Sequence, residues 1–239
     1  MSADPATASA APGLALFDLD DTLLPIDSDH AWGEFVVRLG WVDEASFRAR
    51  NDRYYADYKA GRLDIHDYIE FATGPLRVRG PEACSAAHAR FMREVIAPAL
   101  RPEAQALVAA HRARGDRNAL VTATNDFVTA PIATAFGFAP DDLIAVRLER
   151  EGGGKRSGTI TGRIVGTPSF REGKVARVEE WLAAGGRTWS DYPRVSVYSD
   201  SVNDLPLLER ATDPVATNPS PALEKLARAR GWRILRLFP

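Results

Sequence analysis

Two aspartates separated by one residue, Asp18 and Asp20, follow directly after a short apolar run at residues 14–17. An apolar run of this length that stops at polar residues is typical of a buried parallel strand at its carboxyl end. Ligands of open α/β sheets bind beside that end. Two carboxylates there repel each other unless a cation lies between them. The spacing therefore predicts a cation site or, as the structural alternative, a helix cap or Asx turn.

Three later segments have the same form, a short apolar stretch that ends at small polar residues before a helical pattern. They are residues 118–122, 194–204 and 213–217. Strands that alternate with helices predict βαβ units and a parallel sheet. Right-handed crossovers would bring the strand ends, with their polar side chains, to one edge. We therefore predict an α/β fold whose core is a Rossmann-like parallel sheet.

The stretch after the first of these strands has a different character. Residues 29–98 are rich in Arg, Glu, Ala and aromatic residues at helical spacing. Such aromatic stripes are typical of helix packing rather than of cofactor contacts. We predict a bundle of roughly four helices, inserted as a cap on a core of residues 14–28 and 99–239, with residues 1–13 as a disordered tail. Breaks between the helices are expected at Gly40, Gly61, Gly74-Pro75 and Gly80-Pro81.

The composition is that of an ordinary globular protein. The 239 residues are 45% hydrophobic and 26% charged, and a net charge of −2 gives no electrostatic reason to expect nucleic acid or an anionic membrane as a partner. No apolar run reaches transmembrane length and the first residues do not look like a signal peptide, so the cytoplasm is the expected location. The single cysteine, Cys84, excludes an intramolecular disulfide.

A glycine-rich segment at residues 151–157 invites comparison with a phosphate-binding P-loop. That motif needs a glycine five residues before its Gly-Lys pair and a Ser or Thr after the lysine. Glu149 and Arg156 stand at those positions, which excludes the motif. We predict instead a mobile hairpin tip between strands at residues 145–148 and 159–164.

The polar residues expected at the sheet edge define an oxygen-donor site. Aspartates gather there without clustered His or Cys, and such a set suits Mg²⁺ together with phosphate oxygens. Lys174 begins an amphipathic helix that ends near residue 184, and Thr122 ends a strand, so both could donate to a phosphoryl group. These residue types match phosphoryl transfer better than glycoside hydrolysis, which needs neither a metal nor a lysine.

Four motifs in this order resemble those of the haloacid dehalogenase (HAD) superfamily, and the match covers nearly the whole chain from residue 14. The inserted helices resemble the cap of its phosphoserine-phosphatase-like branch (subfamily IB). The resemblance implies a Mg²⁺-dependent phosphoric monoester hydrolase that acts on a small phosphorylated metabolite. The motifs are Asp18-Leu19-Asp20-Asp21-Thr22, Thr122 at a strand end, Lys174, and Asp200-Ser201-Val202-Asn203-Asp204.

The resemblance also implies a role for each residue that meets the substrate phosphate. Asp18 would be the nucleophile that forms an aspartyl-phosphate. Asp20 would protonate the leaving alkoxide, later deprotonate the attacking water, and contact the metal through its backbone carbonyl. Thr122, the Ala123 amide and Lys174 would bind the phosphoryl group.

The remaining acids of the motifs are implied to bind the metal ion. Asp200 would ligate Mg²⁺ directly beside Asp18, and Asp204 would do so directly or through water. Asn203 would support phosphate binding. The acid at position 20 also favours a phosphomonoesterase over a dehalogenase, because an alkoxide leaving group needs a proton and a halide does not.

Asp27 is the candidate substrate-binding residue. Phosphoserine phosphatases carry a Glu nine residues after the nucleophile for the substrate ammonium, and Asp27 stands at that place; the alternative is a cap of the first inserted helix. Their cap arginine for the substrate carboxylate has no match, since Ala72 takes its place with Arg77 and Arg79 nearby. A bidentate arginine is hard to replace, which disfavours phosphoserine and favours an amino-alcohol phosphate such as histidinol phosphate.

Two other functions stay open at this point. On the same scaffold, a phosphotransferase would use an alcohol in place of water in the second step. A non-catalytic binding module could keep the fold, although it would tolerate loss of the acids, and all of them are present. No residue pattern defines an oligomeric state.

Overall fold

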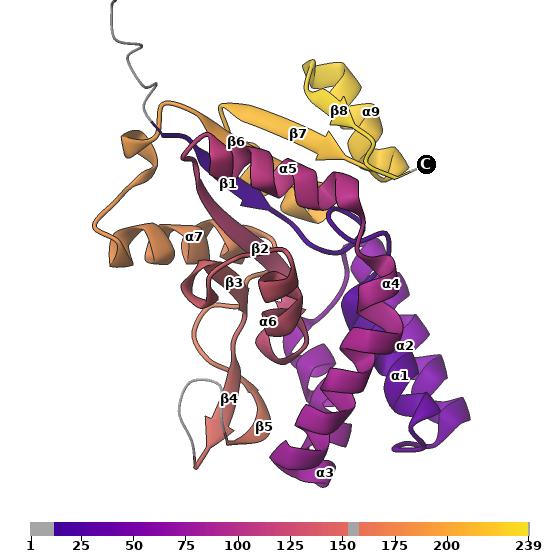
Figure 1. Cartoon of the computed structure of the whole chain (residues 1–239). Coiled ribbons are helices and arrows are strands. Elements are labelled where there is room, and N and C mark those ends of the chain that lie inside the picture. Colours follow the sequence, from indigo (N-terminus) through magenta and orange to yellow (C-terminus); the bar gives the residue numbers. More distant parts are fainter. Residues whose placement is uncertain (1–11, 153–157, 239) are drawn as a thin grey trace, which may run out of the picture.

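The computed structural model describes residues 12–152 and 158–238, and its centre is a parallel sheet (Figure 1). Within the described residues this sheet has six strands in the order β3-β2-β1-β6-β7-β8. The chain first moves outward from β1 to one side and then crosses to the other side, so the strand order reverses between β1 and β6. Ligands of such sheets bind at this reversal point. The strands are β1 (Leu14–Phe17), β2 (Arg117–Asn125), β3 (Leu143–Val146), β6 (Val195–Ser199), β7 (Asp213–Thr217) and β8 (Arg233–Leu235).

Helices cover both faces of the sheet, which explains the uninterrupted apolar run of β1. Leu14 and Leu16 belong to the apolar cluster on one face, with residues of α7, α8 and α9. Ala15 and Phe17 belong to the cluster on the other face, with residues of α5 and α6. Alternate side chains of a strand point to opposite faces, so a strand covered on both sides is apolar throughout. These helices are α5 (Pro102–Ala113), α6 (Asp126–Ala135), α7 (Glu172–Ala184), α8 (Leu205–Leu208) and α9 (Pro221–Arg230), with 3₁₀ turns at Pro140–Asp142, Trp189–Asp191 and Val202–Asp204.

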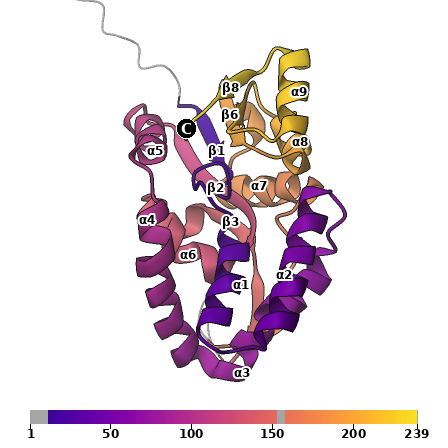
Figure 2. The same ribbon diagram turned by 90° about the vertical axis from the view of Figure 1, so that its right-hand side faces the viewer.

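The segment after β1 forms the expected helical insertion, which Figure 2 shows gathered below the sheet. An aspartate N-cap begins each of its first three helices, and glycines with positive φ follow the first two. The expected break at Gly74-Pro75 is wrong, because both residues lie inside α3. Gly80 (φ 75°, ψ 166°) instead kinks this helix. The helices are α1 (Ser28–Arg38), α2 (Glu44–Lys59), α3 (Ile65–Phe91), the π-helical turn Met92–Ile96 and α4 (Ala97–Ala99).

The predicted hairpin is present but begins later than expected. β4 (Leu148–Glu151) and β5 (Thr159–Ile164) pair antiparallel, whereas Val146 ends β3 of the main sheet. Residues 144–146 are buried against β2, so burial and pairing assign them to the core rather than to the hairpin. The predicted mobile tip falls on residues 153–157, outside the described residues, and so does most of the predicted N-terminal tail.

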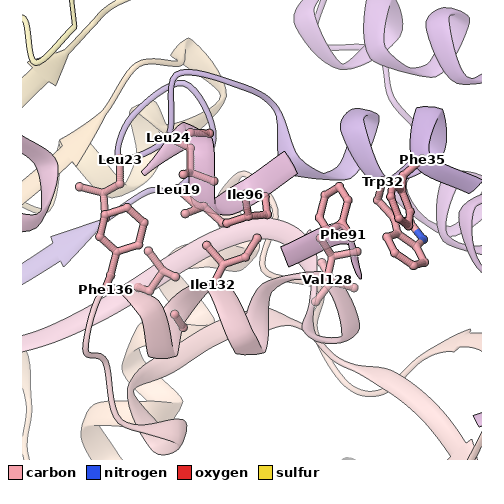
Figure 3. Packing of buried hydrophobic residues seen from close by; sticks show 14 of the residues in the cluster. Leu19, Leu23, Leu24, Trp32, Phe35, Phe91, Ile96, Val128, Ile132 and Phe136 are labelled. Carbon is pink, nitrogen blue, oxygen red and sulfur yellow. The ribbon is translucent and has the colours of Figure 1, made fainter. Parts of the chain in front are cut away.

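An apolar cluster joins the insertion to the core (Figure 3). Leu19 from the loop after β1, Ile132 from α6, and Trp32 and Phe91 from the insertion belong to it, and all are buried. The ring of Trp32 meets that of Phe127 edge-on, with centroids 5.4 Å apart. The insertion is therefore packed onto the core, which positions it over the carboxyl edge of the sheet. In the part of the chain that is described, no helix combines the length and the apolar character needed to cross a membrane.

Candidate active site at the carboxyl edge of the sheet

A tight loop after β1 holds Asp18 at the edge of the sheet. The Asp18 amide donates to the Tyr198 carbonyl (2.9 Å), which fixes its backbone against β6. The Leu19 carbonyl accepts from the amides of residues 22, 23 and 24, and Asp21 takes a left-handed conformation (φ 55°). From the end of β7, the Asn218 amide group donates to the carbonyls of Asp21 and Thr22, at 3.1 Å each. The loop is therefore anchored from a strand far away in sequence.

Lys174 connects Asp18 with Asp204. Its Nζ donates to Asp18 Oδ1 (2.9 Å) and to Asp204 Oδ2 (2.7 Å), and its side chain is fully buried. The Ser199 hydroxyl donates to the same Asp204 oxygen (2.8 Å). Burial alone lowers the pKa of Lys174, but the charges of Asp18 and Asp204 outweigh it and raise this pKa. Lys174 is therefore a fixed cation in the first turn of α7.

The Thr22 hydroxyl brings Asp18 and Asp200 together across β1 and β6. Its oxygen lies 3.5 Å from Asp18 Oδ2 and 3.2 Å from Asp200 Oδ1, and it accepts from the Asp200 amide at 3.0 Å. Two carboxylates from distant parts of the chain thus contact one side-chain oxygen. The predicted juxtaposition of residues 18 and 200 is present in the structure.

Negative charge exceeds positive charge in this cluster, and the pKa values reflect it. Burial raises the pKa of Asp18 to about 7, even though Lys174 acts in the opposite direction. Burial, followed by the charge of Asp18, raises the pKa of Asp200 well above its usual range. A divalent cation would relieve this repulsion, and the donors are carboxylate oxygens, the ligands that Mg²⁺ prefers. The residues present therefore fit a magnesium ion.

Asp20 lies between the sheet edge and the insertion. Its Oδ1 accepts from the Ser28 amide (2.7 Å) and its Oδ2 from the Thr124 hydroxyl (2.8 Å). Burial, together with the charge of Asp27, raises its pKa to about 7. A carboxyl group with such a pKa can both give and take a proton near neutral pH.

Thr122 and Ala123 lie at the same edge and line the pocket that faces the insertion. The Thr122 hydroxyl accepts from the Thr124 amide at 3.1 Å, so its own proton can be donated to a ligand. The pocket is bounded by acids and tyrosines, and no lysine or arginine is among the described residues that line it. It is lined by Asp18, Asp20, Asp27, Asp29, His30, Asn51, Tyr54, Tyr55, Tyr58, Leu63, Ile65, Tyr68, Thr122, Ala123 and Thr124.

Asp27 caps α1 and also lines the pocket, while substrate binding by this residue stays a prediction. Its Oδ1 accepts from the His30 amide (2.8 Å) as the N-cap of α1, and its side chain also lines the pocket. Burial raises its pKa to about 6. The two nearby arginines lie elsewhere: Arg77 donates to the Thr161 carbonyl of β5 (3.2 Å), and Arg79 lies over the Trp41 ring.

Asn203 faces the insertion rather than the acids. Its Nδ2 donates to the Tyr58 carbonyl in the last turn of α2 (3.0 Å). Arg171 precedes α7 and has a φ of 51°. Its side chain donates to the carbonyl of Gly61, just beyond the end of α2. Both side chains thus connect the core to the end of α2. Phosphate binding by Asn203 stays a prediction.

Several polar residues at this site were missed by the sequence reasoning. Thr22 belongs to the first motif but was given no role. Thr124 and Asn218 follow predicted strands, so the rule that strand ends converge could have found them. Asp29, whose side chain lines the pocket, had no signal beyond its closeness to Asp27.

Comparisons with known proteins identify the family of this chain. The family model described as haloacid dehalogenase-like hydrolase matches residues 15–209. A curated relative from Neisseria meningitidis, named histidinol-phosphatase, is 41% identical over 222 residues, which cover 93% of this chain and 97% of that protein.

Two solved structures are also similar. A Bordetella pertussis protein described as having unknown function is 51% identical, with a TM-score of 0.88 over 96% of this chain and 100% of that one. A substrate-bound phosphoserine phosphatase superposes with a TM-score of 0.63 over 94% of this chain and 92% of the other. Its identity of 18% supports a likeness of fold alone.

The raised pKa of Asp18 predicts a pH-dependent stability in EDTA. The pKa of Asp18 is about 7 in the folded protein and 3.8 for the ordinary group, so between these pH values the folded state holds a proton that the unfolded state has lost. Binding of this proton stabilises the folded state, and the stabilisation disappears as the pH rises through about 7. From about pH 6.5 to about pH 8, wild type should lose about 1 kcal/mol of unfolding free energy relative to Asp18→Asn, measured with urea. A difference that is constant or grows with pH would contradict this pKa.

Proposed function

This chain belongs to the haloacid dehalogenase-like hydrolase family, and from that premise we propose that it is a phosphomonoesterase acting through Asp18 on a small phosphorylated metabolite. The observation that supports this function most is the buried contact of Lys174 with both Asp18 and Asp204, next to Asp200. It provides a nucleophile, a cation for a phosphoryl group and acids for a metal ion in one place. Residues 29–98 would act as the cap, and residues 14–28 and 99–239 as the catalytic core.

A Mg²⁺ ion would be held by Asp18 and Asp200, by Asp204 directly or through water, and by the backbone carbonyl of Asp20. When bound, it would offset the repulsion between the Asp18 carboxylate and an anionic phosphate. Lys174 would remain in place as the permanent cation of the site. Carboxylate and carbonyl oxygens are the donor types that suit this ion.

The reaction would take place in two displacements at phosphorus. An Asp18 oxygen forms a bond to phosphorus while the bond to the alkoxide oxygen breaks, and Asp20 gives its proton to that oxygen. Asp20 then removes a proton from water, whose oxygen bonds to phosphorus as the Asp18–phosphorus bond breaks. Thr122, the Ala123 amide and Lys174 would hold the non-bridging oxygens. Inorganic phosphate leaves, and both aspartates return to their starting states.

We infer that the substrate is an amino-alcohol phosphate such as histidinol phosphate. The Neisseria relative with this activity in its name supports the inference, and so does Asp27, an acid in the pocket that could bind an ammonium group. A substrate with a carboxylate, such as phosphoserine, would meet several aspartates and no arginine among the described lining residues. Transfer to an alcohol acceptor is the alternative outcome on this scaffold, and product analysis with added alcohols separates the two. The cytoplasm stays the expected location.

The cap would open to admit the substrate and then close over it. The pocket beneath the cap holds about 480 Å³ of empty space, part of it open to solvent. Closure after binding would exclude bulk water from the phosphoryl-enzyme. The contacts of Asn203 and Arg171 with the end of α2 would break and re-form in this motion.

Asp18→Asn should lose at least about 1,000-fold in kcat while it keeps the fold, because an amide cannot attack phosphorus. Turnover with Mg²⁺ and the circular dichroism of the purified variant are the measurements. Asp21→Asn is the matched control, since Asn tolerates the left-handed backbone at this position and Asp21 has no proposed role. Undiminished turnover by pure Asp18→Asn would refute the mechanism.

In a panel of phosphorylated metabolites, histidinol phosphate should exceed phosphoserine in kcat/KM by at least about tenfold, because the phosphoserine carboxylate has no arginine to bind. Both activities should disappear in EDTA and return with Mg²⁺. The panel is measured by release of inorganic phosphate. If phosphoserine is turned over as fast or faster, the substrate class is wrong although the phosphatase activity stands.

A further inference from the structure

Asp29 is a buried carboxylate that the proposed reaction does not use. It lies in the first turn of α1, is 7% exposed, and its side chain lines the pocket. The Asn125 amide group donates to its Oδ1 at 3.2 Å. The Asn125 oxygen is already engaged as the N-cap of α6, so this amide cannot turn around. The Asp29 carboxylate is therefore held in a fixed position against the pocket.

The environment of Asp29 contains hydrogen-bond donors but no lysine or arginine among the described residues that line the pocket, and the ring of His30, which also lines it, lies 2.8 Å from Asp52. The Tyr68 hydroxyl favours its ionised form, whereas burial and the charges of Asp27 and Asp20 raise its pKa well above the usual range. A carboxylate accepts about four hydrogen bonds, so it keeps acceptor capacity beyond Asn125 and Tyr68. Burial thus favours the neutral form of this acid in the empty protein, and a ligand that supplies a positive charge would favour its ionised form.

Aromatic rings also line this pocket. Tyr54, Tyr55 and Tyr68 line it, and the Tyr54 and Tyr68 rings meet edge to face with centroids 5.4 Å apart. Aromatic faces attract cations and also accept flat heterocycles. Lys59 lies over the Tyr55 ring at 4.3 Å, but it is not among the lining residues. The acids and tyrosines that line this pocket thus suit a cationic or heterocyclic leaving group.

We propose that Asp29 is a specificity residue that gives the pocket a second anionic contact, so that the preferred substrate is a phosphate ester whose alcohol carries two protonatable nitrogens. Asp27 and Asp29 each bind one of these nitrogens. This inference rests on the proposed function, since it assumes that the pocket receives the alcohol part of the ester. It goes further in naming the second acid and the number of nitrogens it selects.

Asp29→Asn keeps the size of the side chain and removes its charge, and Asp27→Asn is the matched variant. Three esters are compared through kcat/KM: histidinol phosphate with two nitrogens, phosphoethanolamine with one, and propyl phosphate with none. Each variant should lose at least about tenfold more on histidinol phosphate than on propyl phosphate. On phosphoethanolamine only one of the two variants should show this selective loss. Equal losses of Asp29→Asn on all three esters, or no loss, would overturn the proposal and leave Asp29 as a structural residue of α1.

A measurement on wild type covers the case in which Asp29→Asn does not fold. Esters that lack either the imidazole ring or the amino group of histidinol phosphate should each fall at least about tenfold in kcat/KM. If one nitrogen accounts for the whole preference, the second contact does not exist. If wild type with Mg²⁺ hydrolyses none of these esters, the proposed function fails and the inference with it. Hydrolysis without selectivity would overturn the inference alone.

Discussion

The Lys174 ammonium contacts Asp18 and Asp204, and the Thr22 hydroxyl holds Asp200 beside Asp18. The rest of the site depends on this imbalance of three acids and one cation. Mutual repulsion of buried acids opposes folding unless something holds them in place. Here the pairing of β1 with β6, the Thr22 hydroxyl and the first turn of α7 do so. In the proposed reaction, the same imbalance would favour a divalent cation at the edge of the sheet and, through that cation, a phosphate.

The division between sheet and insertion follows from this centre. The sheet edge supplies the groups that would act on phosphorus, while α1, α2 and α3 supply the acids and tyrosines that face the rest of a substrate. Apolar packing around Trp32 keeps the base of the insertion on the core. The polar contacts of Asn203 and Arg171 with the end of α2 lie on the side that would open. Chemistry and selectivity are thus assigned to different elements that meet in one pocket.

The sequence predicted the α/β fold because apolar runs that stop at Asp or Thr are a local signal. The prediction is confirmed, yet β8 was missed, and the stretch around β3 and β4 was taken as one strand of a hairpin. The apolar stretch there is divided after Val146: β3 belongs to the main sheet and β4 pairs with β5. Only the pairing of strands in the folded protein determines where this division falls. Thr124 and Asn218 each follow a predicted strand, which places them at the right edge, but their hydrogen-bond partners lie 104 and 197 residues away and no local pattern identifies those partners. Asp29 was missed because its interest lies in its burial beside the pocket, which the sequence does not reveal.

Calorimetric titration of Mg²⁺ tests most directly whether the acids of β1 and β6 hold one cation. Wild type and Asp200→Asn would be titrated without substrate at about pH 8, where the unbound carboxyl of Asp18 has lost its proton. Wild type should bind one ion, and Asp200→Asn should bind it at least about tenfold more weakly while it unfolds cooperatively like wild type. Equal Mg²⁺ affinity in the two proteins would contradict the shared site.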